Sequence, residues 1–307
     1  MDIFLQQIIN GLVQGSIYAM VALGYTMVYG IMGLINFAHG EVVMIGTLVA
    51  ITVVTFLLKL GLPVWLAGGL GIVAATAACM LLGWSLERVA YRPLRNAPRL
   101  TPLITAIGMS IVLQNLAMMI WGRNYMTFPP LVDKTQFEVG GAAFTSVQIM
   151  IVLVSAISMG GLLFLVYRTK LGMAMRATAQ NPSVAGLMGV NANRVISSAF
   201  VIGSALGAVA GVMVGTYYEI AHYQMGFMLG LKAFTAAVLG GIGNLAGAMA
   251  GGVLLGLIEA LGAGYIGDLT GGFLGSHYQD IFAFVVLIFV LMFRPSGLFG
   301  EKTGDRA

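Results

Sequence analysis

The sequence predicts an all-α polytopic integral membrane protein that forms a single transmembrane domain over residues 1–307. The chain is 59% hydrophobic and only 8% charged, whereas soluble domains carry about 25% charged residues. Its apolar segments mostly run for about 18–25 residues, the length that spans a bilayer as a helix. They lack the strict alternation over about ten residues that is typical of the strands of a membrane β-barrel.

About eight transmembrane segments are expected along the chain. They cover residues 4–30, 40–58, 63–86, 101–121, 145–167, 195–217, 229–264 and 278–293. The first is not expected to be a cleaved signal peptide, because no Lys or Arg precedes it. The single cysteine, Cys79, lies inside an apolar segment and is expected to be a small buried hydrophobe.

Glycine recurs every four residues on two of these segments. Gly203, Gly207, Gly211 and Gly215 share one helix face, and Gly243, Gly247 and Gly251 share another. Such spacing lets helix backbones approach closely in lipid. We therefore expect helix packing at these positions, with a glycine-lined substrate path as the alternative.

Most of the 15 basic residues fall into three regions of the chain. These are residues 88–99, 168–194 and 294–306, and the positive-inside rule makes all three cytoplasmic. The polar stretch 122–144 is then periplasmic. Counting crossings back from residue 88 also puts the N-terminus outside.

The segment 229–264 is too long for one ordinary crossing. As a single helix it would measure roughly 54 Å, against a hydrocarbon core of about 30 Å. The sequence GGIGN occupies residues 240–244 near its middle, and both flanking basic regions are cytoplasmic. We therefore expect a broken helical hairpin that enters and leaves on the outer side. Non-helical backbone at that depth must be buried or line a cavity, which makes Gly240, Gly241, Gly243 and Asn244 candidates for the translocation path.

A polar stretch, INFAHGE, separates the first two apolar segments at residues 35–41. In one interpretation Asn36 or His39 caps the second helix and Glu41 faces its positive end. In the other, these three residues form a gate or a contact on the translocation path, because ionisable groups inside a membrane are costly. Residues 30–41 could also form a re-entrant turn.

Two further polar groups lie on the outer side in this topology. Glu219 is surrounded in sequence by Tyr217, Tyr218, His222 and Tyr223. This group is either an interfacial aromatic belt or a docking surface for an extracytoplasmic partner. Lys232 and Glu259 lie toward opposite ends of the expected hairpin and are a candidate ion pair.

The sequence carries no enzyme signature, and we expect no catalytic residue, metal or cofactor. GEKT at 300–303 lacks the G-x-x-x-x-G-K-[ST] pattern, and GIGNLAG at 241–247 misses G-x-G-x-x-G by one position. His39, His222 and His277 do not have metal-ligand spacing. The chain is therefore not expected to hydrolyse ATP by itself.

The stretch RATAQNPSVAGLMGVN, residues 176–191, predicts a short helix over 182–188. Asn181 is a good N-cap before Pro182, and Gly189 suits the position just past the helix. Two turns do not persist alone, so the apolar face formed by Val184, Leu187 and Met188 needs a partner. That partner is either the protein's own membrane-proximal surface or a groove in a cytoplasmic subunit, with Arg176 and Gln180 at the rim.

Several stretches resemble the permease subunits of high-affinity branched-chain amino acid ABC importers. The resemblance extends from about residue 10 to about residue 298 and is less typical over 122–144. The matching stretches are NGLVQGSIYAMVALGYTMVYGIMGLINFAHGEVVMIG, WSLERVAYRPLR, AIGMSIVLQN, GMAMRATAQN, GVNANRVI and LKAFTAAVLGGIG.

This resemblance implies a multi-pass subunit of the bacterial inner membrane. It implies a second, non-identical permease subunit, two cytoplasmic ATPase subunits, and a periplasmic binding protein that delivers leucine, isoleucine or valine. Membrane lipid is a further expected partner, and nucleic acid is not expected. In such importers a short coupling helix sits in a groove of the ATPase, and Ala179, Asn181, Pro182, Gly186 and Gly189 match that loop by position.

Two alternatives follow from the same sequence. Similar permeases import urea or short amides, so the sequence alone does not determine which solute is transported. An ATP-independent secondary transporter is a different class of protein. It predicts discontinuous helices or chains of ion pairs in both halves of the sequence, and a clear break is expected in only one half.

Overall fold

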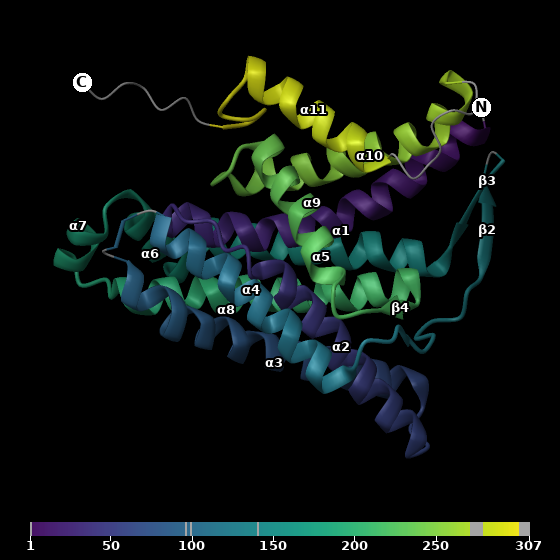
Figure 1. The fold of residues 1–307 in the computed structure, drawn as a ribbon, viewed down its shortest axis with the longest axis horizontal. Coiled ribbons are helices and arrows are strands. Elements are labelled where there is room, and N and C mark those ends of the chain that lie inside the picture. The colour runs from purple at the N-terminus through teal and green to yellow at the C-terminus, as the bar shows by residue number, and fades with distance from the viewer. Residues whose placement is uncertain (1, 96, 99, 140, 271–278, 301–307) are drawn as a thin grey trace.

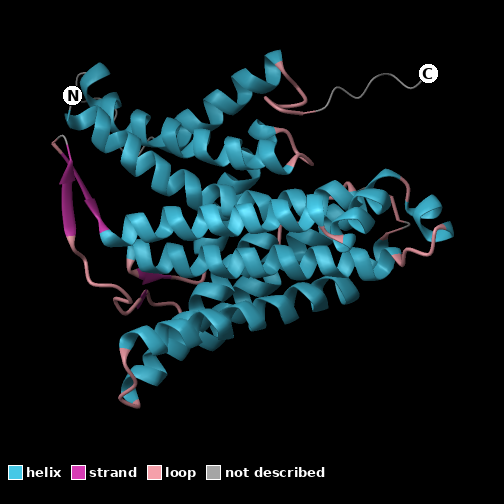
Figure 2. Ribbon diagram, turned by 180° about the vertical axis from the view of Figure 1, so that it is seen from behind, coloured by secondary structure: helices cyan, strands magenta, loops and turns pink. Residues whose placement is uncertain are grey.

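The computed structural model describes residues 1–307 except 1, 96, 99, 140, 271–278 and 301–307. Long helices run along a common axis, and the few short strands lie at one end of the bundle (Figures 1 and 2). The helices are α1 Asp2–Met32, α2 His39–Lys59, α3 Val64–Ser85, α4 Leu100–Trp121, α5 Ser146–Arg168, α6 Lys170–Gln180, α7 Pro182–Leu187, α8 Ala192–Tyr218, α9 Met225–Gly240, α10 Leu245–Leu269 and α11 Gln279–Phe293. The expected all-α polytopic class is confirmed.

Among the described residues, seven helices are long and apolar enough to cross a membrane. They are α1, α2, α3 with its extension, α4, α5, α8 and α10, while α9 and part of α11 are shorter apolar helices. The expected segment 229–264 consists of α9 and α10, which are joined by a turn at 241–244. The count of eight crossings and the hairpin path through the bilayer stay predictions.

α3 does not end where its apolar stretch ends. A π-helical turn, η1 Leu86–Tyr91, and a 3-10 turn, η2 Arg92–Leu94, continue it into the basic region. Single π turns inside helices are rare and re-aim the side chains that follow them. Here they carry Glu87 and Arg92 toward the start of α8.

Two small antiparallel pairs of strands lie away from α7. β2 Gln136–Val139 pairs with β3 Ala142–Thr145, and β1 Met126–Thr127 pairs with β4 Ile220–Ala221. The Gln6 side chain exchanges two hydrogen bonds of 2.9 Å with the backbone of Ala143. The start of α1 and the stretch 122–144 therefore share one end of the bundle, as the parity of crossings predicts.

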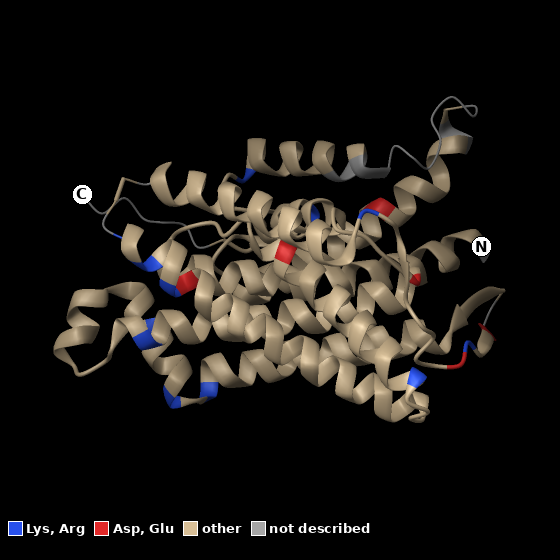
Figure 3. Ribbon diagram, turned by 60° about the horizontal axis from the view of Figure 1, so that its bottom comes forward, with Lys and Arg blue, Asp and Glu red and all other residues tan. Residues whose placement is uncertain are grey.

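The opposite end carries α7 and most of the described basic residues. Figure 3 shows Lys and Arg gathered around the α7 end, with fewer at the end where α1 begins. The residues from the expected cytoplasmic regions include Arg88, Arg95, Arg168, Arg176 and Arg194. The fold thus separates a basic end from an end that carries the strands.

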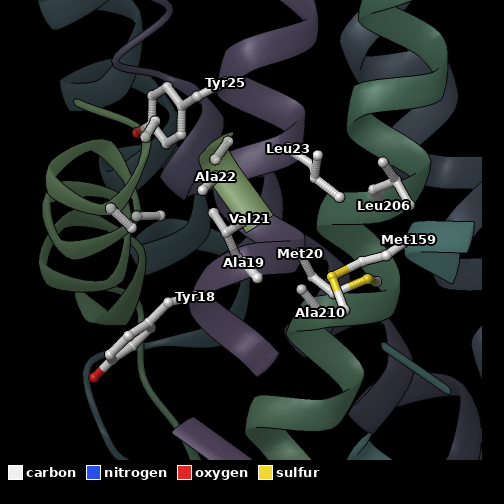
Figure 4. Close-up of a cluster of buried hydrophobic side chains, with 14 of the residues drawn as sticks. Tyr18, Ala19, Met20, Val21, Ala22, Leu23, Tyr25, Met159, Leu206 and Ala210 are labelled. Atoms are coloured by element: carbon white, nitrogen blue, oxygen red, sulfur yellow. The ribbon is translucent and has the colours of Figure 1, made fainter. Parts of the chain in front are cut away.

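α1 forms the centre of the bundle. Every residue from Gly15 to Val28 is buried, which is the pattern of a helix enclosed on all sides by other helices. Figure 4 shows Met20 and Leu23 directed toward Met159 of α5 and Leu206 of α8, while Tyr18 and Tyr25 point to the other side of α1. Packing around α1 thus joins both halves of the sequence.

Glycine lets several of these helices meet backbone to backbone. A Cβ atom added to Gly15 of α1 would lie 2.7 Å from the Cα of Val253 in α10, and one on Gly256 would strike the backbone of Gly15. On α8, a Cβ on Gly211 would strike the carbonyl of Val43 in α2. A Cβ on Gly251 would similarly strike α9 at Ala236. At these positions the glycine spacing serves helix packing.

We predict that Gly256→Ala destabilises the protein, because its new methyl group has no room between α10 and α1. The matched control is Gly160→Ala on α5, where an added Cβ meets nothing within 4 Å. Overpacking costs about 1–3 kcal/mol, whereas Ala in place of an exposed helical glycine gains up to about 1 kcal/mol. Size-exclusion chromatography after heating in detergent should show a lower aggregation temperature for Gly256→Ala only. Equal temperatures for the two variants would contradict this packing.

Candidate coupling and translocation sites

α7 is a short helix whose two ends are fixed by hydrogen bonds from its own sequence. The Asn181 side chain accepts from the N–H groups of Ser183 and Val184 at 3.0 and 3.1 Å. At the other end, Gly189 has φ of +84°, and the N–H of Val190 donates to the carbonyl of Ala185 at 3.0 Å. This is the bonding of a helix that ends in a left-handed glycine. α7 ends at Leu187, one residue before the expected boundary.

One face of α7 is anchored and the other is open. Ala185 is buried, but Val184, Leu187 and Met188 expose 53%, 87% and 81% of their surface. An added Cβ at Gly186 would meet nothing within 4 Å. Within the described part of the chain the apolar face of α7 is therefore left uncovered, at a projecting corner of the basic end (Figure 1).

α6 connects α7 to the ends of the central helices. Arg176 lies 5.4 Å over the ring of Tyr167 in α5. Arg176 and Ala179 also line a cavity of about 100 Å³ together with Gly30 of α1 and Gly243. A displacement of α7 would therefore reach α1 and the 241–244 turn through α6.

The glycine turn between α9 and α10 is covered by the segment 295–300, which we term the C-terminal strap. The strap donates backbone hydrogen bonds from Leu298 to Leu239 at 2.9 Å and from Phe299 to Gly240 at 3.0 Å. The Asn244 side chain donates to the carbonyl of Phe299 at 2.9 Å.

The four candidate path residues of the turn have two different environments. Gly240 is pressed against Gly247, and Gly241, with φ of +107°, lies against Gly300 of the strap. Gly243 and Asn244 instead line a cavity of about 810 Å³ at the basic end, together with Tyr29 and Ala179.

The second polar stretch, 35–41, lies deep in the bundle. Asn36 accepts hydrogen bonds from the N–H of Ala38 at 3.1 Å and from the hydroxyl of Tyr91 at 2.7 Å. The N-cap of α2 is Ala38, without a side-chain bond, so the expected cap by Asn36 or His39 is wrong. The Asn36 side chain is instead bonded to the turn that precedes the helix and to Tyr91 of η1.

His39 and Glu41 of α2 fit into spaces left by glycine. The buried His39 ring meets the Tyr25 ring edge-on, with centroids 5.0 Å apart, and a Cβ on Gly207 of α8 would lie 3.3 Å from it. A Cβ on Gly226 would lie 2.6 Å from the Oε2 atom of Glu41. The first turn of α2 is thus in contact with α1, α8 and the first turn of α9.

Glu41 is bound by two side chains of α4 that the sequence analysis did not single out. The Ser110 hydroxyl donates to its Oε1 atom at 3.0 Å, and the Gln114 amide donates to the same oxygen at 2.7 Å. Ser110 and Gln114 are four residues apart in a mostly apolar helix, so they share one face. That spacing was the available signal, although nothing local identifies Glu41 as their partner.

Glu87 in η1 forms a second cluster that sequence reasoning missed. Its fully buried carboxyl group pairs with Arg92 at 2.8 Å and with Arg95, and it accepts from Ser197 of α8 at 2.7 Å. Arg92 also donates to Ser197 at 2.9 Å. This cluster ties the end of α3 to the beginning of α8, close in sequence to α7.

The polar group at the opposite end holds connecting segments together. Glu219 ends α8 with φ of +59° and lies 2.5 Å from Lys134. Its carbonyl accepts from Phe128 at 2.8 Å, and His222 lies 3.0 Å from the carbonyl of Arg123. The stretch 122–144 is therefore fastened to the α8–α9 connection.

The candidate ion pair of α9 and α10 is present. Lys232 lies 3.1 Å from Glu259, whose carboxyl group is buried and accepts from the Tyr18 hydroxyl at 2.7 Å. The pair therefore joins α9, α10 and α1. Among the described residues, no group of three or more His, Cys, Asp or Glu side chains is placed to hold a metal ion.

Long apolar helices with buried charges paired between them define a polytopic membrane protein, and its basic end carries an uncovered apolar helix. Membrane transport permeases are proteins of this class. The chain matches the family described as branched-chain amino acid transport system, permease component, over residues 7–291. It belongs to this family and is a multi-pass inner-membrane protein.

Curated relatives agree over nearly the whole chain. The high-affinity branched-chain amino acid transport system permease protein LivH of Escherichia coli K12 is 46% identical, covering 99% of this chain and 97% of that protein. The corresponding permease protein BraD of Pseudomonas aeruginosa is 47% identical, covering 99% and 98%. A probable LivH of Methanocaldococcus jannaschii is 28% identical, covering 97% and 94%. Among solved structures, PsaBC from Streptococcus pneumoniae aligns with a TM-score of 0.46 at 14% identity, covering 96% of this chain and 92% of that chain.

Proposed function

We propose that this chain is the membrane-spanning permease subunit of an ABC importer that carries leucine, isoleucine and valine into the cell. The observation that carries the proposal is its likeness, at 46–47% identity and over nearly its whole length, to proteins named as high-affinity branched-chain amino acid permeases. ATP hydrolysis then belongs to separate subunits, which is consistent with a sequence that has no phosphate-binding loop pattern.

The working importer contains this chain, a second and non-identical permease subunit, two cytoplasmic ATPase subunits and a periplasmic amino-acid-binding protein. The basic end is its cytoplasmic side. α7 docks there in a groove of an ATPase subunit. The uncovered face of Val184, Leu187 and Met188 supports this assignment, because an apolar patch of this kind in a capped, ordered helix marks an interaction site.

Closure of the ATPase subunits moves α7, and two connections carry the motion into the bundle. Through α6 it reaches the cavity that Arg176 and Ala179 share with Gly30 and Gly243. Through α8 it reaches α3, because the Glu87 cluster ties these helices together. Rocking of the helices then alternates access between the two sides of the membrane.

We predict ATP-dependent uptake of labelled leucine by proteoliposomes that contain all subunits and the binding protein. Unlabelled isoleucine and valine in excess should compete with the label, whereas urea and acetamide should not. Omission of the ATPase subunits should abolish uptake. Competition by urea in place of the amino acids, or uptake without the ATPase subunits, would contradict the proposed function.

We predict that Gly186→Asp uncouples the importer. The side chain has open space in this chain, so any defect arises in the docked complex, where it would bury an unpaired carboxylate at a cost of several kcal/mol. The matched control is Gly186→Ala, which favours the helix by up to about 1 kcal/mol. Leucine uptake should fall at least about tenfold, since about 1.4 kcal/mol gives that factor, for Gly186→Asp only. Normal uptake by Gly186→Asp would make the docking assignment wrong.

A further inference from the structure

A cavity of about 400 Å³ lies between α4 and α9. This volume is within the range of small-molecule sites, about 300–1,000 Å³. Each helix presents one stripe to it at i, i+3, i+4 and i+7 spacing. The stripes are Ile107, Ser110, Ile111 and Gln114 of α4, and Gln224, Phe227, Met228 and Leu231 of α9.

The α4 wall of this cavity attracts positive charge. The Ser110 hydroxyl donates its hydrogen to Glu41, and the Gln114 amide donates one of its two hydrogens to the same carboxyl oxygen. Toward a ligand they still offer the lone pairs of the Ser110 hydroxyl, the amide oxygen of Gln114 and the second amide hydrogen of Gln114. The Oε2 atom of Glu41 has no hydrogen-bond partner among the described residues, although the side chain is fully buried. A buried acid behind acceptor groups is suited to an ammonium ion.

The α9 wall starts at a helix N-terminus, whose first turn also lies beside the Glu41 carboxyl group at Gly226. α9 begins at Met225, and its N-cap, Gln224, makes no side-chain capping bond. The Met225 N–H donates to the His222 carbonyl at 3.1 Å, and the N–H groups that follow it in the first turn, together with the helix dipole, favour an anion. Between the two polar edges the walls are aliphatic and aromatic, from Ile107, Ile111, Phe227 and Leu231.

We propose that this cavity is a substrate subsite for a zwitterionic amino acid with a branched aliphatic side chain. The ammonium group faces Ser110 and Gln114 in front of Glu41, the carboxylate faces the start of α9, and the side chain lies against Ile111 and Leu231. This assignment rests on the proposed function and deepens it, because the permease itself then recognises its substrate. A lipid tail in the same space would offer no partner to the polar atoms that these bonds leave unused, such as the amide oxygen of Gln114, which is costly.

The subsite is tested by cysteine labelling in the complete importer, with a matched pair of variants on α4. Ile111→Cys places a thiol on the cavity wall, whereas Val112→Cys places one at the same depth outside the cavity, and the native residues are similarly exposed at 54% and 47%. The native Cys79 is buried and stays in both variants. A charged thiol reagent should label Ile111→Cys and leave Val112→Cys unlabelled.

Leucine should protect Ile111→Cys against the reagent. At ten times its half-saturating concentration it leaves about one site in ten free, so labelling should slow about tenfold. 4-Methyl-2-oxopentanoate, which lacks the ammonium group, and 3-methylbutylamine, which lacks the carboxylate, should protect at least about tenfold less well, as the loss of a charged hydrogen bond implies. Adding Gln114→Leu to Ile111→Cys should preserve labelling and remove protection.

Each other outcome overturns the subsite. An unreactive Ile111→Cys would mean that lipid or the second permease subunit fills the cavity. Labelling without protection by leucine would mean that the cavity is an aqueous space that does not bind leucine. Protection by the amine and by the oxo acid as strong as that by leucine would mean that neither polar wall contributes to binding. Leucine uptake by the unmodified complex, measured in the same proteoliposomes, tests the proposed function independently of the subsite. Uptake without protection would reject the subsite and keep the proposed importer function. Protection without uptake would keep the subsite and reject the importer function.

Discussion

Close contact between the backbones of α2 and α9 positions the polar interior of this protein. A Cβ on Gly40 would strike the carbonyl of Gly226, and one on Gly230 would lie 3.0 Å from the Cα of Gly40. With no side chains between them, the first turns of the two helices touch, and the carboxyl group of Glu41 fits beside Gly226. Larger residues at these positions would push α9 away and remove both the α4–α9 cavity and the environment of Glu41. Small residues thus achieve in lipid what hydrophobic burial achieves in water.

Buried acids fasten the helices that glycine brings together. Glu41 joins α2 to α4, Glu87 joins α3 to α8, and Glu259 joins α10 to α9 and α1. An acid inside a membrane protein is tolerated when it pairs with a base or accepts hydrogen bonds. Each tie therefore fixes a helix pair in register, so that displacement at one end of a helix is felt at its neighbour. α7 is the contrasting element, because its apolar face has no such tie.

Local sequence patterns predicted the parts of the structure that depend on residues close together in the chain. The length of the apolar segments predicted the long helices, and GGIGN predicted the break at 241–244. Asn181, Pro182 and Gly189 predicted the bounds of α7 to within one residue. Contacts between distant positions were not predictable in this way. Ser197 lies 110 residues from Glu87, Gln114 lies 73 residues from Glu41, and Phe299 of the strap lies 55 residues from Asn244. The cap of α2 was wrong for the same reason, since Tyr91 of η1 engages Asn36.

Coupling through α7 is the central claim, and site-specific photo-crosslinking in the intact complex tests it most directly. A photoreactive amino acid at Leu187, 87% exposed, should form a crosslink to an ATPase subunit. The same probe at Met119, 77% exposed near the far end of α4, should not. Crosslinks from position 187 only to lipid or to this chain itself would contradict the account.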